Sequence, residues 1–261
     1  MADRPDIQDL QRVGTLFHPE VAALAADAEQ AGLRPAAEDK PRVHLLLQIF
    51  HPAWWLDADG RHPEPFTVIT REAVENGVWR PTLEAEWSRD YVLKLQQQAK
   101  KDLVVWPYHV PLGGLGSALD PELWSAVFWH SLARRSQPGL WTKGSNPKTE
   151  HYSILRPEVR VEDLPEADRT REFLGLFDEY EYILLAGEAE THCVLETVRD
   201  LVELLRGKPE KLSRVFILRD CMSPVRHPLI DFHALAVEAF KKYEKLGVQF
   251  ITSSDPLPFV P

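Results

Sequence analysis

The sequence predicts an α/β protein with a mostly parallel sheet flanked by helices. From residue 83 on, short apolar runs alternate with helical stretches of roughly 10 to 18 residues, the pattern of a parallel sheet with helical crossovers. The chain has 261 residues, 44% of them hydrophobic, which is enough for a packed core. We expect one domain, residues 43–261, after an N-terminal arm, residues 1–42.

The expected domain begins with two unlike segments. The arm is polar apart from a short helical stretch at residues 19–31. Residues 43–50 (VHLLLQIF) form an apolar run typical of a buried strand. Residues 51–82 are rich in Pro and Trp, and they carry large side chains that an ordered excursion would bury: Trp54, Trp55, Phe66 and Trp79.

The regular alternation begins after this excursion. The spacing predicts helices at residues 83–100, 121–135, 167–180, 192–206 and 230–246. It predicts strands at residues 102–106, 152–155, 182–186, 214–219 and 248–252.

Charge and composition exclude several classes of partner. The chain carries 30 Lys and Arg against 40 Asp and Glu, a net charge of −10. Nucleic acid is therefore not an expected partner, because phosphate binding needs a basic face. No apolar run approaches the roughly 20 residues that span a bilayer, and the first residues lack the apolar stretch of a signal peptide. With only two cysteines, a disulfide framework is excluded, and we expect a cytoplasmic protein without membrane contact.

The segment AGEAETHC (186–193) follows a predicted strand and opens a helix. A thiol at a helix N-terminus has a lowered pKa, so Cys193 is a candidate nucleophile. Gly187 and Ala189 permit a tight turn whose backbone N–H groups could bind an oxyanion. The alternative is that Cys193 is a small buried apolar residue, the commonest role of a free cysteine.

Two further loops carry candidate residues. His109 follows the strand at 102–106 and is either a metal or substrate ligand or a loop histidine bonded to a backbone carbonyl. Lys143 lies in the loop WTKGS (141–145), where a lysine is usually solvated. Cys221 has Arg219 and Arg226 as neighbours in the sequence, but we expect a structural role for it.

Taken together, three motifs resemble those of the isochorismatase-like cysteine hydrolases, the superfamily that contains the nicotinamidases. They are WPYHVPLGGLG (106–116), TKGSNPKTEHYS (142–153) and AGEAETHCVLET (186–197), in the order of the family. The resemblance covers most of residues 48–257 and implies a three-layer α/β/α fold.

The resemblance also implies roles for individual residues. Cys193 matches the nucleophile that attacks an amide carbonyl or a similar carbon, and Lys143 matches the lysine beside this thiol, which helps hold it as thiolate or stabilises charge. The backbone N–H groups of Ala189 and Cys193 match the oxyanion hole, and the bond Glu188–Ala189 falls where the family often has a cis peptide. His109 matches one histidine of the nicotinamidase metal site.

The sequence departs from the family at its first strand. The family has a catalytic Asp there, followed later by an Asp-x-His metal motif, whereas residues 43–50 contain no carboxylate. We interpret this as an internal shortening near residues 47–48. The carboxylates that could replace the acid are Asp57, Asp59, Glu150 and Glu190, of which Glu190 is our first choice because it adjoins the nucleophile turn.

Two main functions follow. The first is a cysteine hydrolase that cleaves the C–N bond of a small amide. The second is an inactive relative that lacks the catalytic Asp and serves in binding or assembly. A third interpretation, a redox sensor, requires Cys221 as partner of Cys193. The resemblance implies a divalent metal such as zinc, of whose ligands only His109 is present, and it implies a homo-oligomer.

Overall fold

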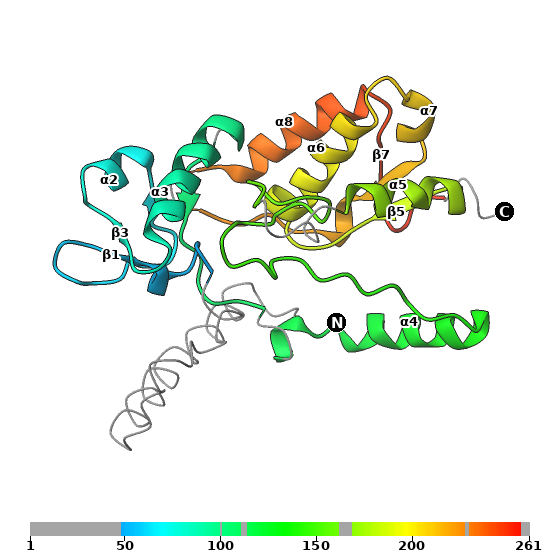
Figure 1. Ribbon diagram of the computed structural model, residues 1–261. Helices are drawn as coiled ribbons and strands as arrows, with labels where there is room; N and C mark the ends of the chain where they lie inside the picture. Colours follow the sequence, from blue (N-terminus) through cyan, green and yellow to red (C-terminus); the bar gives the residue numbers. More distant parts are fainter. Residues whose placement is uncertain (1–47, 100, 111–113, 162–168, 228–229, 257–261) are drawn as a thin grey trace, which may run out of the picture. The chain divides into compact units, whose positions relative to one another are not determined.

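The computed structural model describes residues 48–99, 101–110, 114–161, 169–227 and 230–256 (Figure 1). The predicted arm, with its helix at 19–31, and residues 43–47 of the predicted first strand lie outside these ranges. The chain divides into two compact units, the first ending at Thr149 and the second beginning at Glu150. Each unit is described separately below. Among the described residues, no helix is both long and apolar enough to cross a membrane.

The first unit combines short strands with helices. Its strands are β1 (Trp55–Leu56), β2 (Val68–Ile69), β3 (Arg80–Pro81) and β4 (Leu103–Val104). Its helices are η2 (Pro52–Trp54), α2 (Arg71–Glu75), α3 (Ala85–Lys94), the π-helix η3 (Leu95–Ala99), η4 (Leu115–Ser117) and α4 (Pro121–Arg134). The predicted helices at 83–100 and 121–135 are confirmed.

The residue 51–82 excursion is ordered, as predicted. Trp54 and Trp55 are buried, and both indole N–H groups have acceptors: Trp54 donates to Ser88 Oγ at 2.9 Å and Trp55 to Ile49 O at 2.6 Å. Burial of a tryptophan is favourable when its N–H finds a partner, so these two residues anchor the excursion.

Two strand predictions in this unit need correction. Residues 48–50 form a turn rather than a strand, because His51 N–H bonds to Gln48 O and the Gln48 N–H donates to His51 Nδ1. The strand predicted at 102–106 exists as β4, but it pairs antiparallel with β2. An apolar run in the sequence shows that a strand can form. Whether this strand pairs parallel or antiparallel depends on its partner strand.

The second unit is an α/β structure with a parallel sheet of order β5-β6-β7. The strands are β5 (Ile183–Leu185), β6 (Val215–Leu218) and β7 (Gln249–Ile251). The helices are α5 (Thr170–Glu179), the π-helix η6 (Glu190–Val194), α6 (Leu195–Leu204), α7 (Pro209–Leu212), η7 (Arg219–Cys221) and α8 (Phe232–Glu244). The predicted α/β class and the alternation from residue 167 on are confirmed.

The core of this unit lies between the sheet and its helices. Val215 and Ile217 of β6 are fully buried and pack with apolar side chains from α5, α6 and α8, among them Phe177, Leu201 and Phe240. Helices α6 and α8 pack side by side (Figure 1). This agrees with two right-handed crossovers made in the same direction, which place both helices on one face.

The strand predicted at residues 152–155 is wrong. The N–H of Ile154 bonds to Thr197 Oγ1 and that of Leu155 to Ser153 Oγ, so side-chain hydroxyls take the place of a neighbouring strand. Leu155 is still buried, 1% exposed, which explains the apolar pattern. The segment is an irregular connection held on α6.

Candidate active site

The candidate site of the second unit lies at the carboxyl ends of its three strands. In open α/β sheets this is the edge where loops gather functional groups. The loop after β5 contains Gly187–Cys193, and the loop after β6 contains Asp220–Ser223. After β7, Ser253 donates to Asp220 from its backbone N–H at 2.8 Å and from its hydroxyl at 2.5 Å. These hydrogen bonds hold the pKa of the Asp220 carboxyl below its ordinary value.

Several hydrogen bonds fix the turn after β5 to the loop after β6. The N–H of Gly187 bonds to Cys221 O at 3.1 Å, and that of Glu190 bonds to Ser223 O at 2.9 Å. The Glu188 carboxylate accepts from the Ser223 hydroxyl at 2.7 Å and from the Ser223 N–H at 3.2 Å. The turn is therefore held at both ends and in the middle.

The backbone of the turn has the features that the sequence predicted. Gly187 has φ of 133°, a conformation that a side chain would strain. The peptide bond Glu188–Ala189 is cis, as the resemblance implies. Cys193 follows in the π-helical first turn that continues directly into α6. Its thiol thus lies at the N-terminal end of a helix, where the macrodipole favours negative charge.

The backbone N–H groups of the residues on either side of Cys193 donate to the same carbonyl. Those of His192 and Val194 both bond to Ala189 O, at 3.2 and 3.1 Å. The carbonyl of Cys193 accepts from Thr197 Oγ1 at 2.7 Å. None of these groups is one of the two predicted oxyanion donors, the N–H groups of Ala189 and Cys193. Cys193 itself is half-buried.

Glu190 is buried, and its carboxylate faces a histidine that sequence reasoning missed. Oε2 of Glu190 lies 2.8 Å from Nδ1 of His233, near the N-terminus of α8. Glu190 is 7% exposed as a residue, whereas the His233 side chain is 57% exposed. The pair therefore forms a hydrogen-bonded path from the turn toward solvent. No motif in the sequence singled out His233, because its partner is 43 residues away.

The other candidate acids are engaged elsewhere. Glu150 is buried, and its carboxylate accepts a hydrogen bond from the Tyr152 hydroxyl at 2.6 Å. Asp57 caps an exposed turn by accepting from the N–H groups of Asp59 and Arg61, and Asp59 forms an ion pair with Arg61. Among the four predicted carboxylates, Glu190 alone belongs to the turn that carries Cys193.

Cys221 lies in η7, after β6. Its thiol is exposed and lies 3.8 Å from Asp220 Oδ1. Arg219, which lies near it in the sequence, pairs with Glu244 and stacks on Phe250. Both cysteines are free thiols in this structure.

His109 and Lys143 belong to the first unit, whereas Cys193 belongs to the second. Nδ1 of His109 lies 2.7 Å from Pro107 O. Desolvation lowers the pKa of His109, the Pro107 carbonyl opposes this effect, and the nearby positive charge of Lys143 lowers the pKa further. The structure thus brings together two of the predicted residues, and their interaction is repulsive once His109 is protonated.

A neutral amide lies beside the lysine loop. Gln48 Nε2 donates to Gly144 O at 2.9 Å, next to Lys143. Gln48 is 6% exposed, and its Oε1 is buried with no hydrogen-bond partner among the residues that the structure describes. Residues 48–50 are the part of the predicted first strand that the structure describes, and they contain no carboxylate.

The described residues do not fit a metal site. No three His, Cys, Asp or Glu side chains of the described ranges gather in a way that could hold an ion. His109 has its Nδ1 on a carbonyl, which is the usual arrangement of a metal-binding histidine, but one ligand is too few for zinc.

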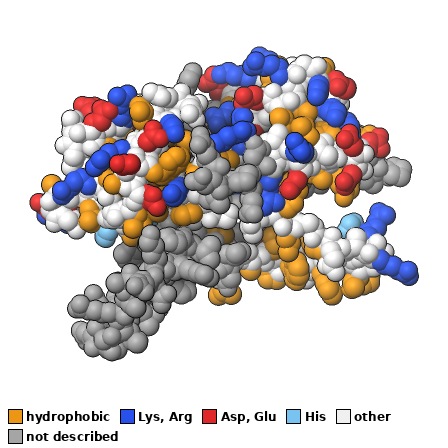
Figure 2. Space-filling model, in the orientation of Figure 1, with side chains coloured by type: hydrophobic (Ala, Val, Ile, Leu, Met, Phe, Trp, Pro, Cys, Tyr) orange, Lys and Arg blue, Asp and Glu red, His pale blue; other side chains and the backbone are white. Residues whose placement is uncertain are grey.

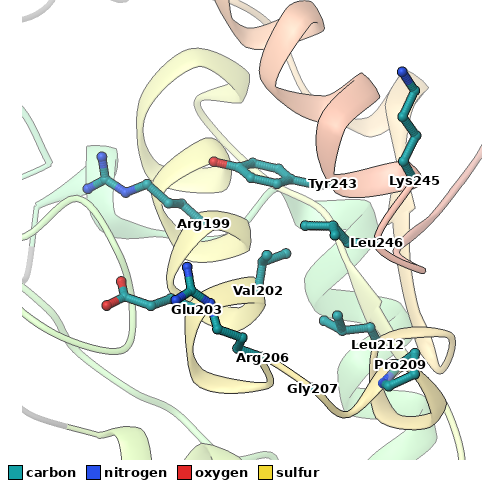
Figure 3. Close-up of a pocket in the computed structure, with 10 residues that line it drawn as sticks. All are labelled: Arg199, Val202, Glu203, Arg206, Gly207, Pro209, Leu212, Tyr243, Lys245 and Leu246. Atoms are coloured by element: carbon teal, nitrogen blue, oxygen red, sulfur yellow. The ribbon is translucent and has the colours of Figure 1, made fainter.

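A pocket of about 710 Å³ lies elsewhere in the second unit (Figure 3). Its lining includes Val202, Arg206, Tyr243 and Leu246, from the C-terminal ends of α6 and α8. Cys193 precedes the opposite end of α6, and at 1.5 Å per residue the ten residues of that helix span ~15 Å. The pocket does not belong to the candidate site.

No family model matches this chain, and no curated protein matches it. It is similar to an Acinetobacter baumannii nicotinamidase/pyrazinamidase structure, with 16% identity and a TM-score of 0.45 over 80% of this chain and 75% of that chain. It is also similar to the yeast nicotinamidase bound to the inhibitor nicotinaldehyde, with 14% identity and a TM-score of 0.41 over 59% of this chain.

This chain spans 61% of the length of that yeast protein. A third similar structure is the pyrazinamidase of Pyrococcus horikoshii in complex with zinc, with 17% identity and a TM-score of 0.35. The similarity covers 56% of this chain and 63% of that chain. These three solved structures are nicotinamidases or pyrazinamidases.

Proposed function

We propose that the chain is an isochorismatase-like cysteine hydrolase that cleaves the C–N bond of a small amide. The observation that carries this proposal is the placement of Cys193. It lies in the first turn of a helix. The turn that leads from β5 into this helix is fixed by hydrogen bonds to Ser223 and Cys221. The N-terminal end of a helix presents partial positive charge to a sulfur placed there.

The proposed reaction has two halves. In the first, the Cys193 sulfur attacks the amide carbonyl carbon, and the negative charge that develops on oxygen is bound by the N–H groups of Ala189 and Cys193. Collapse of this intermediate breaks the C–N bond, and ammonia leaves after taking up a proton. In the second half, water attacks the thioester, the C–S bond breaks, and the acid and the free thiol are released.

The proton in each half needs a carrier near the turn. We assign this role to Glu190 with His233, because Glu190 lies three residues before Cys193 and the pair reaches solvent through His233. Lys143 is proposed as the group that stabilises the thiolate, by resemblance. The amide is proposed to be a nicotinamide-like molecule, because the similar structures are nicotinamidases and pyrazinamidases.

The test is ammonia release from a panel of small amides that includes nicotinamide and pyrazinamide. Cys193→Ala should abolish the release, whereas Cys221→Ala should keep it, since the Cys221 thiol is exposed and faces a carboxylate. Equal activity in the wild type and in Cys193→Ala would refute the proposal.

A second candidate function is that of an inactive relative with a binding or assembly role. The observation in its favour is Gln48, which places a neutral amide beside the Lys143 loop. The same assay separates the two: a cooperatively folded wild type that releases no ammonia from any amide would support this alternative.

A further inference from the structure

The pocket at the C-terminal ends of α6 and α8 has walls that come from the second unit alone. Gly207 has φ of 79°, a turn conformation that lets the chain leave α6 and enter α7, and α7 closes one side of the pocket. The pocket volume of about 710 Å³ lies within the range of about 300–1,000 Å³ that is usual for small-molecule sites. Its size therefore suits a small organic molecule.

The centre of the pocket is apolar. Val202 of α6 and Leu246, which follows α8, point toward each other, and Leu212 of α7 lies beside them (Figure 3). Leu212 is 4% exposed, whereas Leu246 is 51% exposed. A molecule bound here would cover the exposed leucine, which is favourable because apolar surface is removed from water. These side chains therefore select a ligand with an apolar body.

The charged side chains that line the pocket are Arg199, Glu203, Arg206 and Lys245. Lys245 extends away from the apolar centre (Figure 3). Glu203 contacts Arg156 at 2.5 Å, so the charge of this carboxylate is compensated. Arg206 is exposed and forms no ion pair with the residues that the structure describes. The guanidinium of Arg206 is therefore the group that can receive an anionic ligand.

The charge around the pocket favours a singly charged ligand. A guanidinium matches the planar carboxylate group, with which it can form two parallel hydrogen bonds. A phosphate dianion would need a second cation, and Glu203 would repel it. Figure 2 shows basic and acidic side chains intermixed over α7 and α8, so this surface offers no extended positive field to a polyanion. A carboxylate is thus the anion that fits.

We propose that this pocket binds a small monocarboxylic acid, with its apolar body against Val202 and Leu246 and its carboxylate on Arg206. The inference is independent of the proposed catalytic activity, because Cys193 does not line the pocket. Since Arg206 is exposed to water, the affinity should fall as the salt concentration is raised.

Isothermal titration calorimetry of the full chain with cinnamate tests the proposal. Cinnamate has an aromatic body and one carboxylate, and cinnamyl alcohol is its neutral counterpart of similar size. We expect saturable binding of cinnamate, and binding of the alcohol that is weaker by about tenfold, because the alcohol lacks the charge-assisted hydrogen bonds to Arg206.

Two pairs of substitutions locate the bound cinnamate. Arg206→Gln should weaken its binding by about tenfold, whereas Arg171→Gln, at an exposed arginine of α5 outside the pocket, should leave the affinity unchanged. Leu246→Gln should also weaken the binding, whereas Leu235→Gln, at a leucine of α8 that is 56% exposed and lies outside the pocket, should not. Urea unfolding curves of the four variants check that the fold is kept.

Three results would overturn the proposal. The first is that cinnamate shows no saturable binding to the wild type. The second is that cinnamate and cinnamyl alcohol bind equally well, so that the carboxylate is not recognised. The third is that neither Arg206→Gln nor Leu246→Gln weakens the binding, which would assign the bound cinnamate to another place, such as the turn that carries Cys193.

Discussion

Glu190 and His233 are joined by a hydrogen bond of 2.8 Å that ties the start of α8 to the turn carrying Cys193. One partner is buried and the other is more than half exposed. A carboxylate enclosed by protein needs such a partner, because burial of an unpaired charge is costly. The arrangement also suits proton transfer, since the imidazole can exchange its proton with bulk water.

The first prediction concerns this pair. Glu190→Gln keeps the shape of the side chain and removes its charge, and His233→Asn removes the titrating ring. If the pair carries the proton, amide hydrolysis should fall by ~10²- to 10⁴-fold in either variant, the usual contribution of general acid–base catalysis. The measurement is kcat for ammonia release across a pH series.

A matched control lies on the same helix as His233. Glu238→Gln makes the same chemical change on the exposed face of α8, where Glu238 pairs only with Lys242 among the described ion pairs. It should retain wild-type activity. If Glu190→Gln also retained full activity and an unchanged pH profile, the pair would be structural only.

The second prediction concerns the hydrogen bonds of Ser223. Ser223→Ala removes the hydroxyl that donates to both oxygens of Glu188, at 2.7 and 2.8 Å. The turn should lose its orientation, and misplacement of a reacting group can reduce the rate by up to ~10²-fold. The free energy of unfolding should fall by only about 0.5–1.5 kcal/mol, since this is one exposed hydrogen-bonding group.

Ser213→Ala provides the comparison for Ser223. The Ser213 hydroxyl donates to Glu210 O at 3.0 Å in an exposed turn away from the loops of the site. Its loss should lower stability by a similar amount and leave kcat unchanged. Equal kcat values for the two alanine variants would show that the Glu188–Ser223 contact does not orient the turn.

The periodicity of apolar residues in the sequence was enough to predict most helices and strands of the second unit. The strand β6 and the helix α8 were each found within two residues of their observed ends, because their apolar residues are both periodic and buried. The position of Cys193 at a helix start followed from the same pattern. The apolar pattern indicates which residues are buried. It predicted the burial of Leu155 correctly, although the strand predicted at this residue is wrong.

Contacts between distant segments could not be predicted in this way. The pairing of β2 with β4 and the contact of Glu190 with His233 depend on which segments meet in space. A single sequence contains no direct signal for either. The same limitation explains the irregular segment at residues 152–155, where Thr197, 43 residues away from Ile154, supplies the acceptor that a strand would have supplied.

The third prediction concerns the titration of His109. Its pKa should lie below the value of about 6.5 of an ordinary histidine. Lys143→Met should raise it, because the ammonium group disfavours the protonated imidazole. The measurement is the pH dependence of the His109 ring signals by NMR in the wild type and in Lys143→Met. An unchanged midpoint would show that the two side chains do not interact.

The lowered pKa of His109 also determines how protonation of this residue changes the stability of the fold. Well above pH 6.5 His109 is neutral in both the folded and the unfolded chain, so it contributes no pH dependence there. As the pH falls below this value, the unfolded chain takes up the proton more readily, and stability is lost until the pH passes the lower pKa of the folded state. His109→Gln should therefore reduce the loss of stability on acidification.

The last prediction concerns the ion pair that holds the irregular segment on α6. Arg156 contacts the buried Asp200 at 2.7 Å and the exposed Glu203 at 2.5 Å. Arg156→Met keeps most of the side-chain volume but leaves the Asp200 carboxylate buried with its cation removed. Leaving one partner of a buried pair uncompensated costs up to ~3–5 kcal/mol, and the one-third exposure of Arg156 reduces this toward ~1–3 kcal/mol.

Arg71→Met is the control for this substitution, because Arg71 pairs with Glu75 on the surface of α2 and such pairs contribute about 0.3–0.5 kcal/mol. Urea unfolding of both variants should show the larger loss for Arg156. If the two variants lost equal stability at neutral pH, the segment would be held by Leu155 and the Thr197 hydrogen bond rather than by the ion pair.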